Sequence, residues 1–429
     1  MKRPWFHGWW IVIAGAAIQF VMSALMLQSF GFYAAALVKE FGWSRGTVGA
    51  AFSFARVEGP LGPPQGWMVS HFGARLVLQI GVVILAGGFF LFAVIDSLWQ
   101  FFVFYIVMSV GATLGGFPTI TIATVSWFDR FRSTALGVSA VGFALGGITA
   151  SSAVAYAIVE FGWRETSMVS GVLTLVLGLP LTFLFHNRPE DIGQHVDGIS
   201  PEEREAYRAA QPARAFSTDV DYTLGEAMRT RAFWTISLGH ASALLVVTAV
   251  QVHLVLHLTN SLGYSDGAAR WILTSMIAMQ AVGQVAGGML GDWVSKRLIV
   301  IACMGMHAVG LLLIAWAGGN LLAVVGFSVL HGIAWGTRGP MMQAIRADYF
   351  GRTHFGAISG WSTAITTIGP LLGPIIAGVL YDWTDSYRLG FTVVALMAAA
   401  GSIFFVLSTR PAPPQRAAAE TAVTSAAGA

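Results

Sequence analysis

An internal repeat constrains this chain more than any other feature of its sequence. A small-residue helix end followed by a basic turn occurs at 66–75 and again, 222 residues later, at 288–297. The same shift pairs Gly66 with Gly288, Ser70 with Asp292, Arg75 with Arg297, Pro118 with Pro340, Phe128 with Phe350 and Arg130 with Arg352. Several matches at one shift indicate two similar halves in parallel order, as in membrane proteins built from repeated bundles.

Long apolar windows show where these halves lie. Hydrophobic residues make up 55% of the 429 residues and charged residues only 10%, whereas about 25% of the residues of a soluble domain are charged. Windows of about 20 apolar residues, enough to cross a bilayer, lie near 9–38, 46–70, 76–95, 99–127, 134–160, 165–186, 232–260, 268–291, 298–316, 320–347, 354–382 and 386–409. We therefore expect an all-α membrane protein with twelve transmembrane helices in two parallel-repeat six-helix bundles.

The polar stretches divide the chain further. Residues 187–231 form one long polar insertion, and the sequence after Arg410 is rich in proline and alanine. The predicted organisation is an N-terminal bundle at 1–186, a cytoplasmic linker at 187–231, a C-terminal bundle at 232–409 and a disordered cytoplasmic tail at 410–429.

The basic residues predict the orientation in the membrane, because Lys and Arg accumulate on the cytoplasmic side. With the N-terminus inside, the inner segments hold Lys2, Arg3, Arg75, Arg130, Arg132, Lys296, Arg297, Arg346, Arg352, Arg410 and Arg416. Both termini are expected in the cytoplasm, on a multi-pass protein of the inner (plasma) membrane. The net charge of +3 follows from this asymmetry, so we expect a lipid bilayer and no nucleic acid as partner.

Charged residues inside the predicted spans are the main candidates for a functional site. An Arg near the centre of a membrane helix costs about 2.5 to 3.5 kcal/mol, so it usually faces a water-filled cavity or another charge. Arg56 and Glu58 interrupt the second span, and Arg338 lies in the tenth with no acid in its own span. Arg338 is our first choice for binding an anion and Arg56 the second, and Glu58 is the candidate for moving a proton. A structural arginine and a static ion pair are the rival interpretations.

Uncharged polar residues extend the list of substrate-binding candidates. These candidates are Gln28, Tyr33, His253, Gln280 and Gln284. Such residues either line a cavity or bond to a neighbouring helix, and the sequence favours neither explanation. His253 and His257 share a helix face, but the pattern offers no third ligand, so we expect no metal. The lone Cys303 excludes an internal disulfide.

These features together resemble the major facilitator superfamily over nearly the whole chain. Shorter motifs are similar to its bacterial monocarboxylate-transporter-like branch, namely Gly8-Trp9-Trp10, Glu40 to Arg45, Trp127 to Arg130, Phe161 to Arg164, Arg188 to Asp191 and Ser386 to Arg388. In that branch an Arg in span eight commonly serves the substrate carboxylate, and Gln284 stands there in this chain. The first turn also departs from the superfamily, with Ser70 and His71 where Asp and Arg are usual.

The resemblance implies a secondary active transporter that works by alternating access, with two bundles rocking about a site near the bilayer midplane. The implied substrate is a small organic anion such as a monocarboxylate, and the implied coupling is proton symport through Glu58. The two turns are expected to form the cytoplasmic gate through Ser70, Arg75, Asp292 and Arg297. We expect a monomer without a cofactor.

Two alternatives stay open. Drug or metabolite efflux is one, although the glycines at 142, 146 and 147 lack the Gly-Pro of the antiporter signature. A membrane receptor that binds its ligand without translocating it is the other. An enzyme is not expected, because the sequence shows no nucleophile–base set and no metal pattern.

Overall fold

In the first half of the chain, the described parts of the membrane spans are helical. The computed structural model describes residues 5–44, 47–48, 58–210 and 220–414. Several spans of this half consist of two or three helical segments in line. The segments are α1 (Gly8–Met22), the π-helix η1 (Ser23–Leu27), α2 (Phe30–Phe41), α4 (Glu58–Phe72), α5 (Ala74–Ala93), α6 (Leu98–Gly115), α7 (Phe117–Trp127), α8 (Arg132–Leu145), η2 (Gly146–Ala150), α9 (Ser151–Phe161), α10 (Trp163–Leu173), η3 (Thr174–Gly178) and α11 (Leu179–Thr182).

The second half repeats this arrangement with straighter helices. They are α14 (Arg231–Leu256) with η7 (His257–Ser261), α15 (Asp266–Gly291), α16 (Lys296–Ala315), α17 (Leu321–Phe350), α18 (Phe355–Thr366), α19 (Ile368–Thr384) and α20 (Tyr387–Leu407). The intervening segment 183–230, here called the linker, carries η4 (Pro189–Ile192), η5 (Val196–Gly198), α12 (Pro201–Ala210) and α13 (Leu224–Met228). The structure confirms the prediction of an all-α protein with two six-helix bundles.

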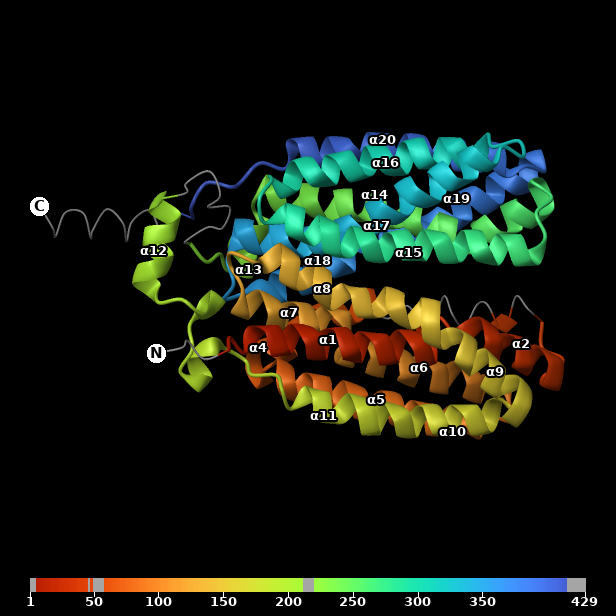
Figure 1. The fold of residues 1–429 in the computed structure, drawn as a ribbon, viewed down its shortest axis with the longest axis horizontal. Helices are drawn as coiled ribbons and strands as arrows, with labels where there is room; N and C mark the ends of the chain where they lie inside the picture. The colour runs from red at the N-terminus through yellow and green to blue at the C-terminus, as the bar shows by residue number, and fades with distance from the viewer. Residues whose placement is uncertain (1–4, 45–46, 49–57, 211–219, 415–429) are drawn as a thin grey trace, which may run out of the picture.

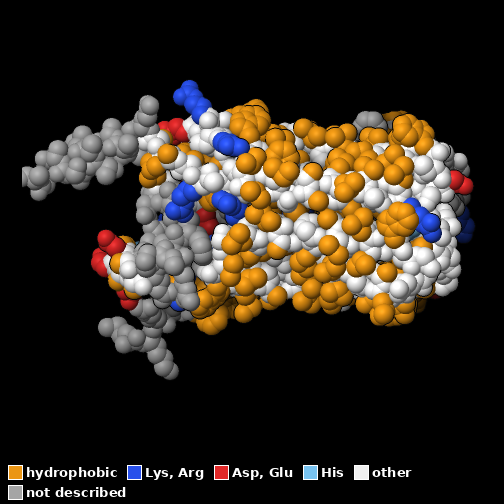
Figure 2. All heavy atoms as spheres, turned by 90° about the horizontal axis from the view of Figure 1, so that it is seen from above, with side chains coloured by type: hydrophobic (Ala, Val, Ile, Leu, Met, Phe, Trp, Pro, Cys, Tyr) orange, Lys and Arg blue, Asp and Glu red, His pale blue; other side chains and the backbone are white. Residues whose placement is uncertain are grey.

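The helices match a membrane environment in length and surface. Among the described residues, ten helical stretches are long and apolar enough to cross a membrane, and a pair bent by 42°, Arg132–Thr149 with Ser152–Phe161, adds an eleventh. The predicted second span at 46–70 lies partly outside the described residues, and α4 covers its remainder. Hydrophobic side chains cover the body of the molecule in Figure 2, whereas Lys and Arg lie near its two ends.

The two bundles lie side by side with nearly parallel axes, and α12 and α13 lie at one end (Figure 1). We call this end the linker end and the opposite one the far end. The main contacts between the bundles are those of α4 with α18 and of α8 with α15, and α8 also contacts α17. Glycines let the backbones meet there, because a Cβ at Gly62 would clash with the carbonyl of Gly360 and one at Gly288 with the carbonyl of Ser133. The site lies in the space between the bundles, beside these helix contacts.

Helix breaks in the first half shape that space. The first span is interrupted at Gln28, where the hydroxyl of Ser29 donates to the carbonyl of Ala24. The fourth span breaks at Gly116, with φ −110° and ψ −147°, between α6 and α7. Its counterpart α17 continues unbroken through Pro340. The halves therefore differ where they face the space between them.

Candidate functional site

A cavity of about 420 Å³ lies between the two bundles. This volume falls within the usual range for small-ligand sites. Its walls come from both halves, since Gln19, Gln28 and Ser109 lie on one side and Gln251 and Trp335 on the other. No acidic or basic side chain lines it within the described part of the chain. The cavity therefore suits a small solute that makes amide, hydroxyl and aromatic contacts.

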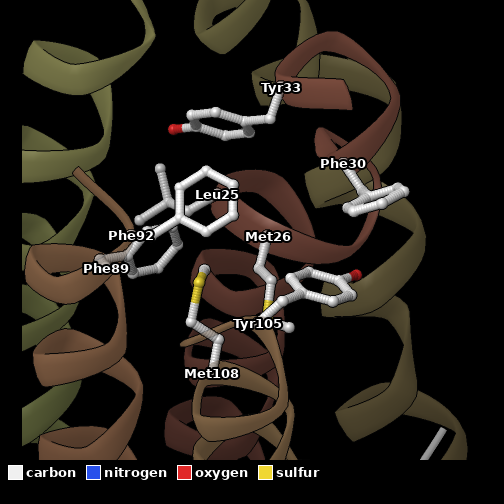
Figure 3. A pocket seen from close by; sticks show the side chains of 8 residues that line it. All are labelled: Leu25, Met26, Phe30, Tyr33, Phe89, Phe92, Tyr105 and Met108. Atoms are coloured by element: carbon white, nitrogen blue, oxygen red, sulfur yellow. The ribbon is translucent and has the colours of Figure 1, made fainter. Parts of the chain in front are cut away.

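A second, far smaller cavity of about 10 Å³ adjoins it within the first bundle (Figure 3). It is walled by aromatic, aliphatic and methionine side chains from η1, α2, α5 and α6. Met26 and Tyr105 line both cavities. This space is about the size of one water molecule, so it lets the two methionine side chains move but is too small for a ligand.

Gln28 and Tyr33, which were both predicted to bind substrate, line different cavities. Gln28 lines the central cavity at the break in the first span. Tyr33 lines the small cavity, where its hydroxyl lies 3.2 Å from that of Ser170 and its ring packs edge-on against Phe92. Tyr33 thus bonds to a neighbouring helix of its own bundle.

Arg338 lies in the core of the second bundle and not on the wall of the central cavity. Its side chain is 1% exposed, and its Nε and Nη1 have no hydrogen-bond partner among the described residues. Two buried histidines lie nearby, with Nδ1 of His307 3.1 Å from Nδ1 of His331. The ring of His331 also faces Trp335, which lines the cavity. A buried, unpaired guanidinium therefore lies one helical turn from the cavity wall.

Arg346, two turns further along α17, is equally buried but bonded. Its Nη1 donates to Oε1 of Gln343 at 3.1 Å and its Nη2 lies 3.0 Å from Nδ1 of His240. Ser359 of α18 donates to the same Gln343 oxygen. Two guanidiniums thus share one face of α17, and only Arg338 has no partner in the described structure.

The predicted substrate-binding residues of spans seven and eight lie away from the central cavity. His253 lies 2.9 Å from the carbonyl of Pro374 through Nε2 and 3.2 Å from the hydroxyl of Tyr387 through Nδ1. Gln280 and Gln284 are buried in α15, and the side-chain oxygen of each has no partner in the described residues. None of the three lines the central cavity.

Two predicted charges cannot be placed. Arg56 lies outside the described residues. Glu58 begins α4, but its side chain falls outside the described structure as well. The next residue, Gly59, lines the central cavity. Their roles as second anion site and proton carrier stay predictions.

The predicted gate residue Asp292 joins the two bundles at the linker end. It follows α15 and accepts hydrogen bonds from the backbone of Ser133 at 2.8 Å, and from the backbone and hydroxyl of Thr134 at 3.2 and 2.6 Å. These groups begin α8, so the carboxylate caps a helix N-terminus across the interface, where the helix dipole favours negative charge. Burial raises the pKa of Asp292, against these hydrogen bonds.

A buried ion-pair network missing from the sequence predictions adds to this closure. Asp348 at the end of α17 binds Arg132 of α8 at 2.6 Å and Lys296 of α16 at 2.8 Å. Arg352 donates to the carbonyl of Ser126 in the first bundle at 3.0 Å. We call the cluster Arg132, Asp348 and Lys296 the linker-end lock. In the sequence, all three are charged residues at predicted helix ends. The positive-inside rule explains such basic residues equally well, so the sequence alone does not point to an ion pair.

The other predicted gate residues make no ion pair or hydrogen bond to the other bundle in the described structure. Ser70 donates to the carbonyl of Gly66 and faces Gly356 of the other bundle. The guanidinium of Arg75 lies over the ring of Phe183, 4.8 Å from its centroid. Arg297 is half-buried beside Lys296, which makes the ion pair instead. Whether they gate transport stays a prediction.

Comparison with known proteins decides the family. The family model described as Major Facilitator Superfamily matches residues 16–253 and 236–428. The chain belongs to the Major Facilitator Superfamily. As a member of this superfamily it is a transporter and not an enzyme.

Individual superfamily members are similar over almost their whole length. Monocarboxylate transporter 13 of Bos taurus is 25% identical over 95% of this chain and 93% of its own. The oxalate:formate antiporter of Oxalobacter formigenes is 24% identical over 89% of this chain and 87% of its own. The crystal structure of the human organic anion transporter MFSD10 (TETRAN) superposes with a TM-score of 0.71 at 14% identity, over 94% of this chain and 100% of that one. That last likeness concerns the fold alone.

Replacing Asp292 with asparagine is expected to weaken closure at the linker end. The amide keeps one acceptor oxygen but loses the charge that favours a helix N-terminus, worth about 0.3 to 2 kcal/mol. Exchange in proteoliposomes should change in rate while the protein elutes as a folded monodisperse species. Kinetics equal to those of the parent would assign Asp292 a structural role only.

Proposed function

We propose that this protein is a secondary active transporter of small organic anions, monocarboxylates among them, that works by alternating access. The observation that carries the proposal is the 420 Å³ cavity between two bundles that are locked together by ion pairs and hydrogen bonds at the linker end. A cavity shared by two rigid bundles is what alternating access requires. A receptor that binds without transport does not need a cavity shared by two bundles.

The choice of an anion rests on charge. Arg338 is fully buried with two unpaired guanidinium nitrogens, and leaving such a cation unpaired in the membrane is costly. A carboxylate matches the fork of donors that a guanidinium presents. We place the carboxylate-binding step at Arg338, reached past Trp335, with Gln28 and Gln251 contacting the rest of the solute. Relatives named for monocarboxylates and for oxalate and formate support this class.

The proposed topology puts the linker end in the cytoplasm. The basic residues of that end, Arg75, Arg130 and Arg297 among them, favour this orientation through the positive-inside rule. The structure then has its cytoplasmic side closed. The inner membrane is the proposed location.

Counterflow in proteoliposomes tests the function. Vesicles loaded with one unlabelled carboxylate should take up the labelled compound, across a panel of lactate, pyruvate, oxalate, formate and aromatic acids. A receptor would bind a panel member, as seen by thermal shift, without any exchange. Exchange restricted to lipophilic cations would instead support the efflux alternative.

Glu58 is the proposed proton carrier, because it begins α4 beside cavity-lining Gly59. Replacing it with glutamine is expected to abolish uptake driven by a pH gradient while exchange of substrate for substrate persists. The two assays on one vesicle preparation provide the control for each other. Equal loss of both activities, together with poor expression, would indicate a structural ion pair.

A further inference from the structure

The linker binds both bundles through equivalent contacts. Asp197 accepts hydrogen bonds from the backbone of Asp129 at 3.1 Å and of Arg130 at 2.9 Å, in the turn between α7 and α8. Asp221 accepts from the backbone of Arg352 at 2.7 Å and of Thr353 at 3.2 Å, in the turn between α17 and α18. The 222-residue shift superimposes Arg130 on Arg352. One linker carboxylate therefore caps the same turn in each half.

An arginine that crosses to the other bundle lies in or directly after each capped turn. Arg132 begins α8, directly after the first turn, and binds Asp348. Arg352 lies in the second turn and donates to the carbonyl of Ser126. Fixing the backbone of a turn restricts where its side chains point, so the two linker carboxylates restrain both cross-bundle arginines.

The linker helix α12 connects to the same cross-bundle contacts through charge. Nε of Arg204 lies 3.3 Å from Oδ2 of Asp129, and the other oxygen of Asp129 lies 3.3 Å from Arg132. Arg132 in turn binds Asp348, which also holds Lys296. Arg130 adds a second hold on α12, with its guanidinium 4.3 Å from the ring centroid of Tyr207. A continuous chain of alternating charges thus runs from the linker to the linker-end lock.

The contact at Asp221 is made by a charged carboxylate at neutral pH. Burial raises the pKa of this carboxyl, but the hydrogen bonds from Thr353 and Arg352 outweigh that effect and leave the pKa below its ordinary value. Hydrogen bonds that include an ionised group are roughly twice as strong as neutral ones.

We propose that Asp197, Arg204 and Asp221 are positioning residues of the transport cycle, through which the linker stabilises the conformation closed at the linker end. This inference rests on the alternating-access function proposed above. The linker docks on both turns in the closed state and must release at least one of them when the bundles part. Its docking thereby sets the ratio of closed to open molecules.

Spin-label distances test this inference without any substrate. Leu76 and Leu298 lie in the first turns of α5 and α16, are related by the 222-residue shift and are 43% and 58% exposed. Labels at Leu76→Cys and Leu298→Cys, in a Cys303→Ser background, report the separation of the bundles by double electron–electron resonance in nanodiscs. The measurement is made in this protein and again with Asp292→Asn added, where weaker closure raises the open population.

Asp197→Asn, Asp221→Asn and Arg204→Gln are each expected to lower the closed-to-open ratio about three- to tenfold. Arg204→Lys should retain most of the parental ratio. The matched control is Glu205→Gln, which removes a carboxylate charge, as the two aspartate variants do, from an exposed residue of α12 with no hydrogen bond or ion pair in the described structure. Parental distance distributions for all three variants in both backgrounds would overturn the inference, as would a lower unfolding temperature with unchanged distances. If these variants shift the ratio but the parent shows no exchange, the inference holds and the proposed function fails.

Discussion

Arg338→Lys is expected to weaken binding of a carboxylate by about 10- to 100-fold while the protein still folds. Arg338 is 1% exposed and two of its guanidinium nitrogens have no partner in the described structure, so two donors can bind an incoming anion. Lysine keeps the charge but presents one compact ammonium in place of the fork, and a bidentate contact becomes a single one. The loss of one charge-assisted hydrogen bond, about 1.5 to 3 kcal/mol, gives the stated range.

Arg346→Lys is the matched control for this experiment. Arg346 lies on the same helix, is equally buried, and already bonds to Gln343 and His240. We expect this variant to bind the carboxylate within about threefold of the parent, because both terminal nitrogens of Arg346 already contact protein groups and only its Nε is unpaired. Binding is measured by thermal shift and by isothermal titration on detergent-purified protein. If Arg338→Lys and Arg338→Ala both bind as tightly as the parent, Arg338 is structural and the organic-anion proposal loses its main support.

The fold could be predicted from the sequence because it depends on properties that are local or periodic. Apolar windows locate the spans, and the 222-residue shift reveals the two halves before any contact is known. The same shift pointed to Asp292 as a gate candidate. In the structure its carboxylate accepts hydrogen bonds from the backbone of Ser133 and Thr134 in the other bundle.

The details of the site were less accessible to sequence reasoning. The depth of Arg338 in its helix could be counted, but whether it faces the cavity or the core depends on how α17 rotates against α15 and α16. Glycine contacts set that rotation, for example between Gly336 and the carbonyl of Gln280. The linker-end lock joins residues 216 positions apart, and nothing local in the sequence distinguishes a buried ion pair from a solvated basic turn.

The linker-end lock gives the second large expected effect, since one carboxylate neutralises two buried cations. Arg132, Asp348 and Lys296 have side chains 1%, 6% and 6% exposed. Removing one partner of a buried ion pair costs about 3 to 5 kcal/mol, mostly from the charge left behind. Asp348→Asn removes the carboxylate that Arg132 and Lys296 share, and it leaves Arg132 with Asp129 as its carboxylate partner. We therefore expect it to disfavour the closed state more than Asp292→Asn, which breaks neither of these two buried ion pairs.

In the open state water can solvate Arg132 and Lys296. The variant can therefore open at this end without unfolding. Asp348→Asn is expected to shift the Leu76–Leu298 label distances almost completely to the open form, and to slow exchange severely while the purified protein remains folded. Adding Arg132→Met and Lys296→Met removes the two cations that Asp348 neutralised and should restore much of the closed population, since apolar replacement of buried ion-pair partners is often neutral or stabilising. If Asp348→Asn leaves the label distances unchanged, or if the triple variant is no more closed than the single one, buried charge pairing does not hold the bundles together at this end.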